Sequence, residues 1–318
     1  MKKNYCILLI PFVLSFLFMM SCKMEKELVS GEGTLLAGGF ETWYRIVGEG
    51  EKTPLVMLHG GPGAPSFYLN PLSDLGDERP VVFFDQPGCG RSASVEDMEK
   101  LGVDFFVEHL EAFRKALGIK QFYLYGQSWG SALAIEYYLK YPDGIDALIL
   151  SSPLISSEKW IADTDYLVTK LPGEIQKDIR LHEAQKTYDS PEYQQAIMAF
   201  YEQFVARKLP WSADIDSTFA YLGADVYMHM WGPSEFTVTG LLKDFDRTGA
   251  LGDIQVPVLY ITGEYDEARP ETVQYFQSLT PGAHFAEIGG AAHLTMQDKP
   301  EEDIRVIREF LHYLESKK

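Results

Sequence analysis

The sequence predicts an α/β fold in which a mainly parallel sheet is wrapped by helices and interrupted by a helical insertion. Short apolar runs without polar alternation recur along the chain, as is typical of strands buried on both faces. Helical patterns separate these runs, which favours parallel strands joined by helices. Between residues 153 and 246 the strand rhythm stops, and helical patterns rich in Tyr, Trp and Gln replace it.

Composition supports a folded protein and weighs against nucleic acid as a partner. The chain has 318 residues, of which 46% are hydrophobic and 23% are charged, close to the averages of globular domains. Its 46 acidic residues against 28 Lys and Arg give a net charge of −18. A surface this acidic repels phosphate backbones, so we expect no nucleic-acid binding.

The N-terminus has the order of a secretory signal. Lys2 and Lys3 precede an apolar run over residues 6–20, and small residues follow. The run is shorter than the ~20 residues that a membrane-spanning helix needs. We therefore expect residues 1–21 to be a cleaved signal peptide, with a permanent anchor helix as the alternative.

The junction after the apolar run resembles a bacterial lipoprotein cleavage site. In such sites the cysteine, here Cys22, becomes the lipidated first residue, although Met19 stands where leucine is usual. Residues 22–33 are polar and contain glycine, as expected of a tether. The prediction is export to the bacterial cell envelope, in the periplasm or at the outer membrane, with a lipid anchor as the membrane contact. Plain secretion is the alternative.

The rest of the chain divides into a core in two parts, residues 34–152 and 247–318, and a helical cap, residues 153–246. The alternative is a separate C-terminal domain, but the two strand-like runs after the insertion need a sheet to join. Helical spacing of apolar residues marks residues 106–117, 132–139 and 304–314. Strands are predicted at residues 43–47, 55–58, 81–84, 122–125, 147–150, 258–261 and 285–288.

One motif carries chemistry. Residues 126–130 read Gly-Gln-Ser-Trp-Gly, between a predicted strand and a predicted helix. A serine in this strand-turn-helix setting is exposed on a tight elbow and is typical of a nucleophile. We therefore predict that Ser128 is the nucleophile, against the alternative of an ordinary turn serine.

A serine nucleophile needs a base and a group that orients the base. His293 lies in the loop after the last predicted strand, at the sheet edge where open α/β sheets place functional groups, whereas His284 opens that strand. Asp266 follows the preceding strand at the same edge. His293 is thus the predicted base and Asp266 the predicted acid, with Glu264 and Glu267 as rivals for the orienting role.

Acyl transfer also needs NH groups aimed at the developing oxyanion. One is expected from Trp129, the residue after the nucleophile, and another from the glycine-rich loop after the strand at residues 55–58. Gly61 is the predicted second donor. The alternative for this loop is a plain Gly-Pro turn.

Five segments of the sequence carry recognisable motifs. They are His-Gly-Gly-Pro-Gly at residues 59–63, Asp-Gln-Pro-Gly-Cys-Gly-Arg-Ser at 85–92, Gly-Gln-Ser-Trp-Gly-Ser at 126–131, Gly-Glu-Tyr-Asp-Glu at 263–267 and Gly-Ala-Ala-His at 290–293. Taken together, they resemble the motifs of proline iminopeptidases, which include the tricorn-interacting aminopeptidase and are α/β-hydrolases with a helical cap. The resemblance implies the same triad, Ser128, Asp266 and His293. It also implies that Glu235, in the cap, and Glu267 bind the free N-terminus of the substrate.

The expected function is a serine exopeptidase that releases N-terminal proline, with other N-terminal residues left open, from short peptides with a free N-terminus. The alternatives are a small-molecule esterase or lactonase on the same scaffold, since fold does not determine substrate, and a non-catalytic ligand-binding lipoprotein. Cys and His do not cluster at ligand spacing, so we expect no metal site and no cofactor. Cys89 is expected to be a packing residue.

Overall fold

The computed structural model describes residue 1 and residues 28–317. The expected signal peptide beyond residue 1, Cys22 and most of the tether lie outside the described residues. The first strand, β1 (Gly31–Ala37), begins before residue 34, so the expected boundary between tether and core falls inside a strand. Within residues 28–317, no helix is long and apolar enough to cross a membrane.

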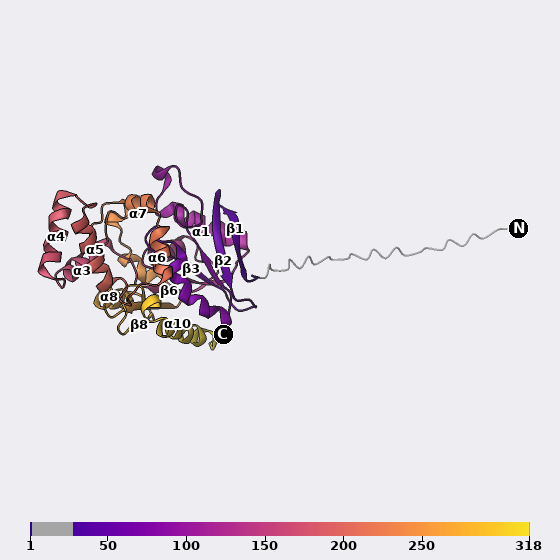
Figure 1. Ribbon diagram of the computed structural model, residues 1–318. Coiled ribbons are helices and arrows are strands. Elements are labelled where there is room, and N and C mark those ends of the chain that lie inside the picture. Colours follow the sequence, from indigo (N-terminus) through magenta and orange to yellow (C-terminus); the bar gives the residue numbers. More distant parts are fainter. Residues whose placement is uncertain (2–27, 318) are drawn as a thin grey trace.

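The described chain forms one sheet of eight strands in the order β1-β2-β4-β3-β5-β6-β7-β8 (Figure 1). The edge pair β1–β2 and the pair β2–β4 are antiparallel, and the six strands from β3 to β8 run parallel. The predicted mainly parallel sheet is confirmed. The other strands are β2 (Phe40–Val47), β3 (Leu55–Leu58), β4 (Val81–Phe84), β5 (Phe122–Gln127), β6 (Ile145–Ser151), β7 (Val258–Gly263) and β8 (His284–Ile288).

Strand β1 has no counterpart in the sequence prediction. It pairs on one side only, and most of its residues are exposed or half-buried, so its sequence lacks a continuous apolar run. Gly38 and Gly39 connect it to β2 with φ of 56° and 92°, backbone conformations that glycine adopts at little cost.

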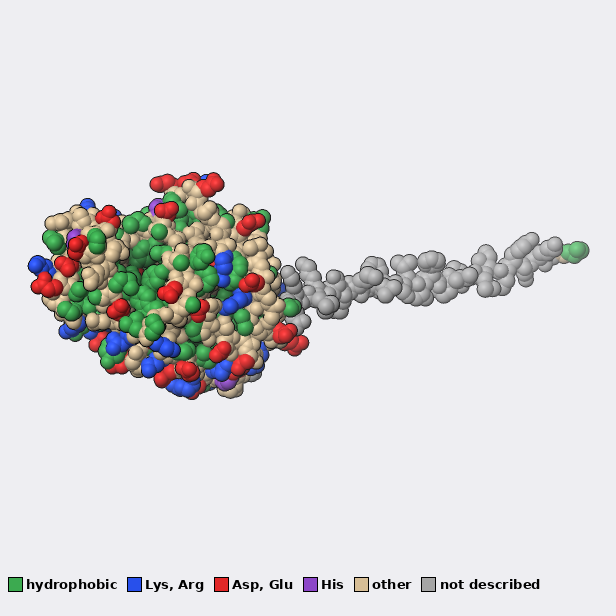
Figure 2. Space-filling model, in the orientation of Figure 1, with side chains coloured by type: hydrophobic (Ala, Val, Ile, Leu, Met, Phe, Trp, Pro, Cys, Tyr) green, Lys and Arg blue, Asp and Glu red, His purple; other side chains and the backbone are tan. Residues whose placement is uncertain are grey.

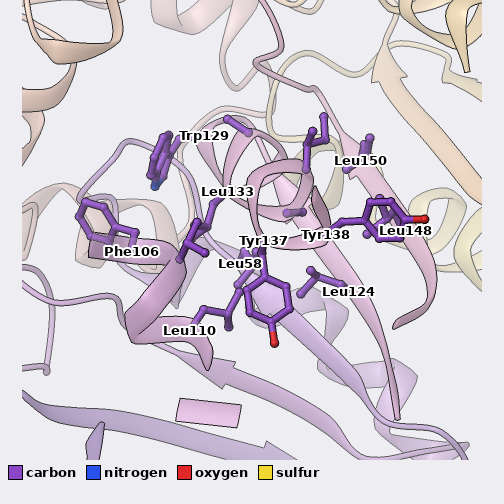
Figure 3. Close-up of a cluster of buried hydrophobic side chains, with 14 of the residues drawn as sticks. Leu58, Phe106, Leu110, Leu124, Trp129, Leu133, Tyr137, Tyr138, Leu148 and Leu150 are labelled. Atoms are coloured by element: carbon purple, nitrogen blue, oxygen red, sulfur yellow. The ribbon is translucent and has the colours of Figure 1, made fainter. Parts of the chain in front are cut away.

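Alternation along the central strands divides the core into two layers. In β3, Val56 and Leu58 face one side, while Leu55 and Met57 face the other. Side chains of α1, α2 and α8 pack on the first face, where Trp129 and Leu133 meet the strands (Figure 3). The 3-10 helix η1 and helix α10 pack on the second face. These elements are α1 (Val103–Leu117), α2 (Trp129–Lys140), α8 (Pro270–Leu279), η1 (Ser66–Asp77) and α10 (Pro300–Glu315).

Residues 153–246 form the insertion, which contains five α-helices and has an apolar cluster of its own. Its two ends meet at an antiparallel bridge between Ser156 and Asp246. Strand β7 then pairs with β6, so the strands after residue 246 lie in the same sheet as those before residue 153. The cap helices are α3 (Ser157–Val168), α4 (Gly173–Gln185), α5 (Pro191–Phe204), α6 (Ala213–Ala220) and α7 (Ala224–Met230).

The remaining short elements are connectors. They are η2 (Met98–Lys100), η3 (Leu241–Asp244), η4 (Thr248–Asp253) and α9 (Thr295–Asp298).

Candidate active site

Ser128 lies on a tight turn between β5 and α2. Its φ of 54° and ψ of −121° are rare for a residue with a side chain. Two glycines allow the turn, because a Cβ on Gly126 would lie 2.2 Å from the carbonyl oxygen of Gly130, and a Cβ on Gly130 would lie 2.3 Å from that of Leu58. The G-x-S-x-G spacing is therefore a requirement of close backbone packing.

The backbone of Ser128 is held from both sides. Its NH donates to the carbonyl of Ser151 at 3.0 Å, and its own carbonyl accepts from Ser131 and Leu154 at 2.9 and 3.2 Å. The residue is 8% exposed and lines a cavity between core and cap. The strained turn thus presents the hydroxyl to one enclosed space.

His293 follows β8 and lines the same cavity as Ser128. Its Nδ1 lies 2.8 Å from Oδ1 of Asp266. Its carbonyl accepts from Gln127 and Ser152, and its NH donates to the carbonyl of Phe204 at the end of cap helix α5. Contacts from core and cap together therefore hold the imidazole in place.

Asp266 is buried and receives hydrogen bonds on both oxygens. Oδ1 accepts from the NH of Ala268 at 2.8 Å besides facing the imidazole, and Oδ2 accepts from Thr262 and from the NH of Gly263 at 3.1 and 3.2 Å. Four donors around one carboxylate fix its orientation toward the imidazole. Such a carboxylate holds Nδ1 of His293 protonated and leaves Nε2 free to accept a proton.

The structure separates Asp266 from its rivals. Glu264 is exposed and accepts from the NH of Gly290. Glu267 lies on the other side of the imidazole, with Oε1 3.6 Å from Nε2 of His293. His284 is exposed and contacts the rings of Phe310 and Tyr313.

The loop after β3 approaches Ser128 closely. A Cβ on Gly60 would lie 3.0 Å from Cβ of Ser128. The NH of Gly60 donates to the hydroxyl of Tyr68. Gly61 has φ of 106° and lines the cavity, and its NH has no partner among the described residues. Trp129 is the first residue of α2, so its NH has no acceptor within the helix. Both NH groups therefore lack an acceptor among the described residues, and their role as oxyanion donors stays a prediction.

A cavity of about 380 Å³ lies above these groups. Cap helices α5, α6 and α7 contribute most of its remaining lining, which is largely apolar. Figure 2 shows hydrophobic side chains gathered in a hollow on this face of the molecule, in the region where Figure 1 places these helices. The cavity is of a size and polarity that suits a small organic ligand.

Two carboxylates face this cavity, the half-buried Glu235 from the cap and the buried Glu267 from the core. Oε1 of Glu235 accepts from the Tyr227 hydroxyl at 2.6 Å, while Oε2 of Glu267 is buried without a hydrogen-bond partner. Burial raises the pKa of Glu235. Burial, together with the charges of Glu235 and Asp266, raises the pKa of Glu267 well above its ordinary value. A cation placed between them would relieve both effects.

Sequence reasoning missed several residues around this site. The Trp160 ring packs edge-on against the His293 ring, with centroids 5.5 Å apart, and its indole NH donates to the Glu235 carbonyl. Tyr201 lines the cavity, and both glutamates raise its pKa, after burial itself. Aromatic residues on helices are usually core residues, so no sequence signal distinguishes these two.

Trp129 and Trp231 are core residues, whereas Tyr227 lines the cavity. The buried indole NH of Trp129 donates to Gln86, and that of Trp231 donates to the carbonyl of Ser234.

Cys89 is buried, and burial raises the pKa of its thiol well above the ordinary value. The part of the chain that the structure describes holds no cluster of His, Cys, Asp and Glu suited to a metal ion.

The raised pKa of Glu267 predicts a pH-dependent stability. Its folded-state pKa lies above the unfolded value of about 4.3, so the folded protein binds more protons between these two values. Stability is therefore greatest below the unfolded pKa and falls as pH rises through the folded one, by up to about 1.4 kcal/mol per pH unit. The Glu267 carboxylate faces Glu235, Asp266 and His293, whose charges affect the pH range over which stability falls.

We expect thermal unfolding of the wild type to lose more stability between pH 5 and pH 8 than that of Glu267→Gln. Glu264→Gln, an exposed carboxyl on the same loop, is the matched control. Equal slopes for wild type and Glu267→Gln would contradict a raised pKa of Glu267.

The sheet, the serine on its turn and the imidazole backed by a carboxylate define a serine hydrolase with an α/β fold. A family model described as alpha/beta hydrolase fold matches residues 53–300. The chain belongs to the proline iminopeptidase family of α/β hydrolases.

Relatives along nearly the whole chain support this membership. The proline iminopeptidase of Heyndrickxia coagulans is 41% identical over 280 residues, which cover 87% of this chain and 96% of that protein. The one from Thermoplasma volcanium is 35% identical over 292 residues, covering 91% and 99%. The crystal structure of the Mycobacterium smegmatis proline iminopeptidase is 35% identical and superposes with a TM-score of 0.83, covering 89% of this chain and 98% of that one.

Proposed function

We propose that this chain is a serine exopeptidase that releases N-terminal proline from short peptides through an acyl-enzyme. The observation that carries the proposal is a pair of carboxylates, the half-buried Glu235 and the buried Glu267, in the same cavity as Ser128. The N-terminal proline of a peptide is a secondary ammonium with two NH donors, and each carboxylate can accept one of them in a charge-assisted hydrogen bond. The relatives named proline iminopeptidase support the same assignment.

The groups at the site account for each step. His293 Nε2 takes the proton of the Ser128 hydroxyl as its oxygen attacks the first peptide carbonyl, while the NH groups of Gly61 and Trp129 stabilise the oxyanion. The protonated imidazole then donates to the leaving amine nitrogen as the C–N bond breaks. Water attacks the acyl-enzyme after losing a proton to His293, and that proton returns to the Ser128 oxygen as the amino acid leaves.

The Asp266 carboxylate keeps the imidazole in the tautomer with the proton on Nδ1, which these proton transfers need. Glu267, 3.6 Å from Nε2, places negative charge beside the imidazolium that forms. The substrate amine neutralises part of that charge. Asp266 thus orients the base, while Glu267, which has no role in the triad, binds the amine.

The test compares proline arylamide with its N-acetylated form. We expect acetylation to reduce kcat/KM by at least about 100-fold, because a carboxylate pair that loses its cation remains uncompensated. Glu235→Gln should weaken turnover of the free amine and leave the acetylated form unaffected. Equal turnover of both forms, or hydrolysis of simple esters alone, would favour an esterase or lactonase instead.

We further propose that the protein is exported and carries lipid on Cys22. The order of Lys2, Lys3, the apolar run and the cysteine supports this proposal. Mass spectrometry of the mature N-terminal peptide tests it. An acylated Cys22 as first residue is the expected result, and an unmodified cysteine in that peptide would contradict lipidation.

A further inference from the structure

The cavity above Ser128 is lined by both buried and solvent-exposed side chains. Glu267 is buried and Glu235 is half-buried, and burial raises the pKa of each. Besides Gln194 and Ala224, three large apolar lining residues are exposed: Met198 at 39%, Phe219 at 42% and Met228 at 53%. They come from α5, α6 and α7, one from each helix. We call these three residues the mouth.

This polarity gives the substrate a direction, if the proposed function holds. A substrate amine between Glu235 and Glu267 and a carbonyl at Ser128 place the first residue inside the cavity. The exposed lining residues mark where the cavity opens to solvent, so the segment after the scissile bond leaves past the mouth. The second residue of the peptide therefore contacts Met198, Phe219 and Met228.

The chemistry of the mouth favours apolar groups. Methionine is flexible and polarisable and adapts to varied apolar partners. The Phe219 ring stacks between Trp211 and Tyr201, with centroid distances of 5.5 and 6.1 Å and an interplanar angle of 20° in each case. This stack gives the mouth one rigid aromatic wall that leads toward the glutamates.

The charges around the cavity add a second constraint. Among the described lining residues, the ionisable acids and bases are Glu235, Glu267 and His293, besides tyrosines, and no Lys or Arg is present. An acidic second residue, or the free carboxylate of a dipeptide, would lose water at the mouth without gaining a cationic partner.

We propose that the mouth residues Met198, Phe219 and Met228 form a leaving-group subsite that selects an apolar, uncharged second residue. The substrate class is then N-terminal prolyl peptides with a hydrophobic second residue, and longer or amidated peptides are preferred over free dipeptides. Burial of the apolar side chain at the mouth stabilises the complex, because it removes apolar surface of both partners from water.

The first experiment measures kcat/KM of the wild type on Pro-Phe-NH₂, Pro-Gly-NH₂ and Pro-Asp-NH₂, and on Pro-Phe with a free carboxylate. We expect Pro-Phe-NH₂ to exceed Pro-Gly-NH₂ by about tenfold and Pro-Asp-NH₂ by more. The free dipeptide should fall below its amide. Equal values for the three amides would overturn the subsite.

The second experiment places charge at the mouth with Met198→Lys and Met228→Lys. Both side chains are exposed, so the variants should fold, which thermal unfolding checks. The ratio of kcat/KM for Pro-Asp-NH₂ to that for Pro-Phe-NH₂ should rise about tenfold. Leu181→Lys, on exposed cap helix α4 outside the cavity lining, is the control and should leave the ratio unchanged.

The outcomes separate the two proposals. Unchanged ratios in both lysine variants overturn the subsite while the proposed function stands, provided that the wild type hydrolyses prolyl amides. Absence of hydrolysis of every prolyl compound overturns the proposed function and the subsite together.

Discussion

Replacement of Ser128 by alanine should lower kcat on proline arylamide by roughly 10⁴- to 10⁶-fold, as expected when a nucleophile that acts as a unit with its base is removed. The variant should keep its fold, because the backbone of residue 128 holds the turn through three hydrogen bonds. Steady-state kinetics and labelling with a serine-directed fluorophosphonate measure the effect.

Ser278→Ala, an exposed serine on α8, is the matched control and should retain both rate and labelling. Labelling that persists in Ser128→Ala would show that another residue is the nucleophile. Loss of labelling would in turn contradict a non-catalytic binding protein.

Replacement of Asp266 by asparagine should lower kcat by about 10⁴-fold. Each oxygen of this carboxylate accepts two hydrogen bonds, so either orientation of the amide sets its NH₂ group against donors. If the NH₂ group faces His293, the imidazole must accept at Nδ1 and carry its proton on Nε2, where it cannot take the proton of Ser128.

The measurement is kcat on proline arylamide across pH, since a tautomer effect lowers the rate at every pH at which the enzyme is folded. Asp253→Asn, an exposed aspartate before β7, is the control. A wild-type rate in Asp266→Asn would return the orienting role to another carboxylate.

The central strands could be predicted from sequence because both of their faces are buried. A run such as Leu55–Leu58 has apolar side chains toward two helical layers, which leaves a signal in four consecutive residues. Strand β1 lies at an edge and shares its burial with solvent, so the same signal is absent. Edge strand β8 was nevertheless predicted at residues 285–288, so position at an edge does not by itself hide a strand.

In the candidate site, residues at strand ends could be predicted from the sequence, whereas most residues of the cap could not. Ser128, Asp266 and His293 each follow a strand end, so chain order and sheet topology predict their meeting. Their catalytic roles stay predictions until the variants are measured. The cap contributions depend on tertiary packing. Glu235 was expected only from the family resemblance, and Trp160, which contacts both His293 and the Glu235 backbone, was not expected at all.

The backbone bonds between the cap and the His293 loop have a consequence for access. The NH groups of His293 and Leu294 donate to the carbonyls of Phe204 and Val205, where α5 ends. A swing of this part of the cap would therefore break hydrogen bonds to the general base. We therefore expect the N-terminal end of a substrate to enter the cavity through the mouth as an unstructured segment. The enzyme would thus sort peptides by the flexibility of their first residues, and a proline at the start of a folded domain would be out of reach.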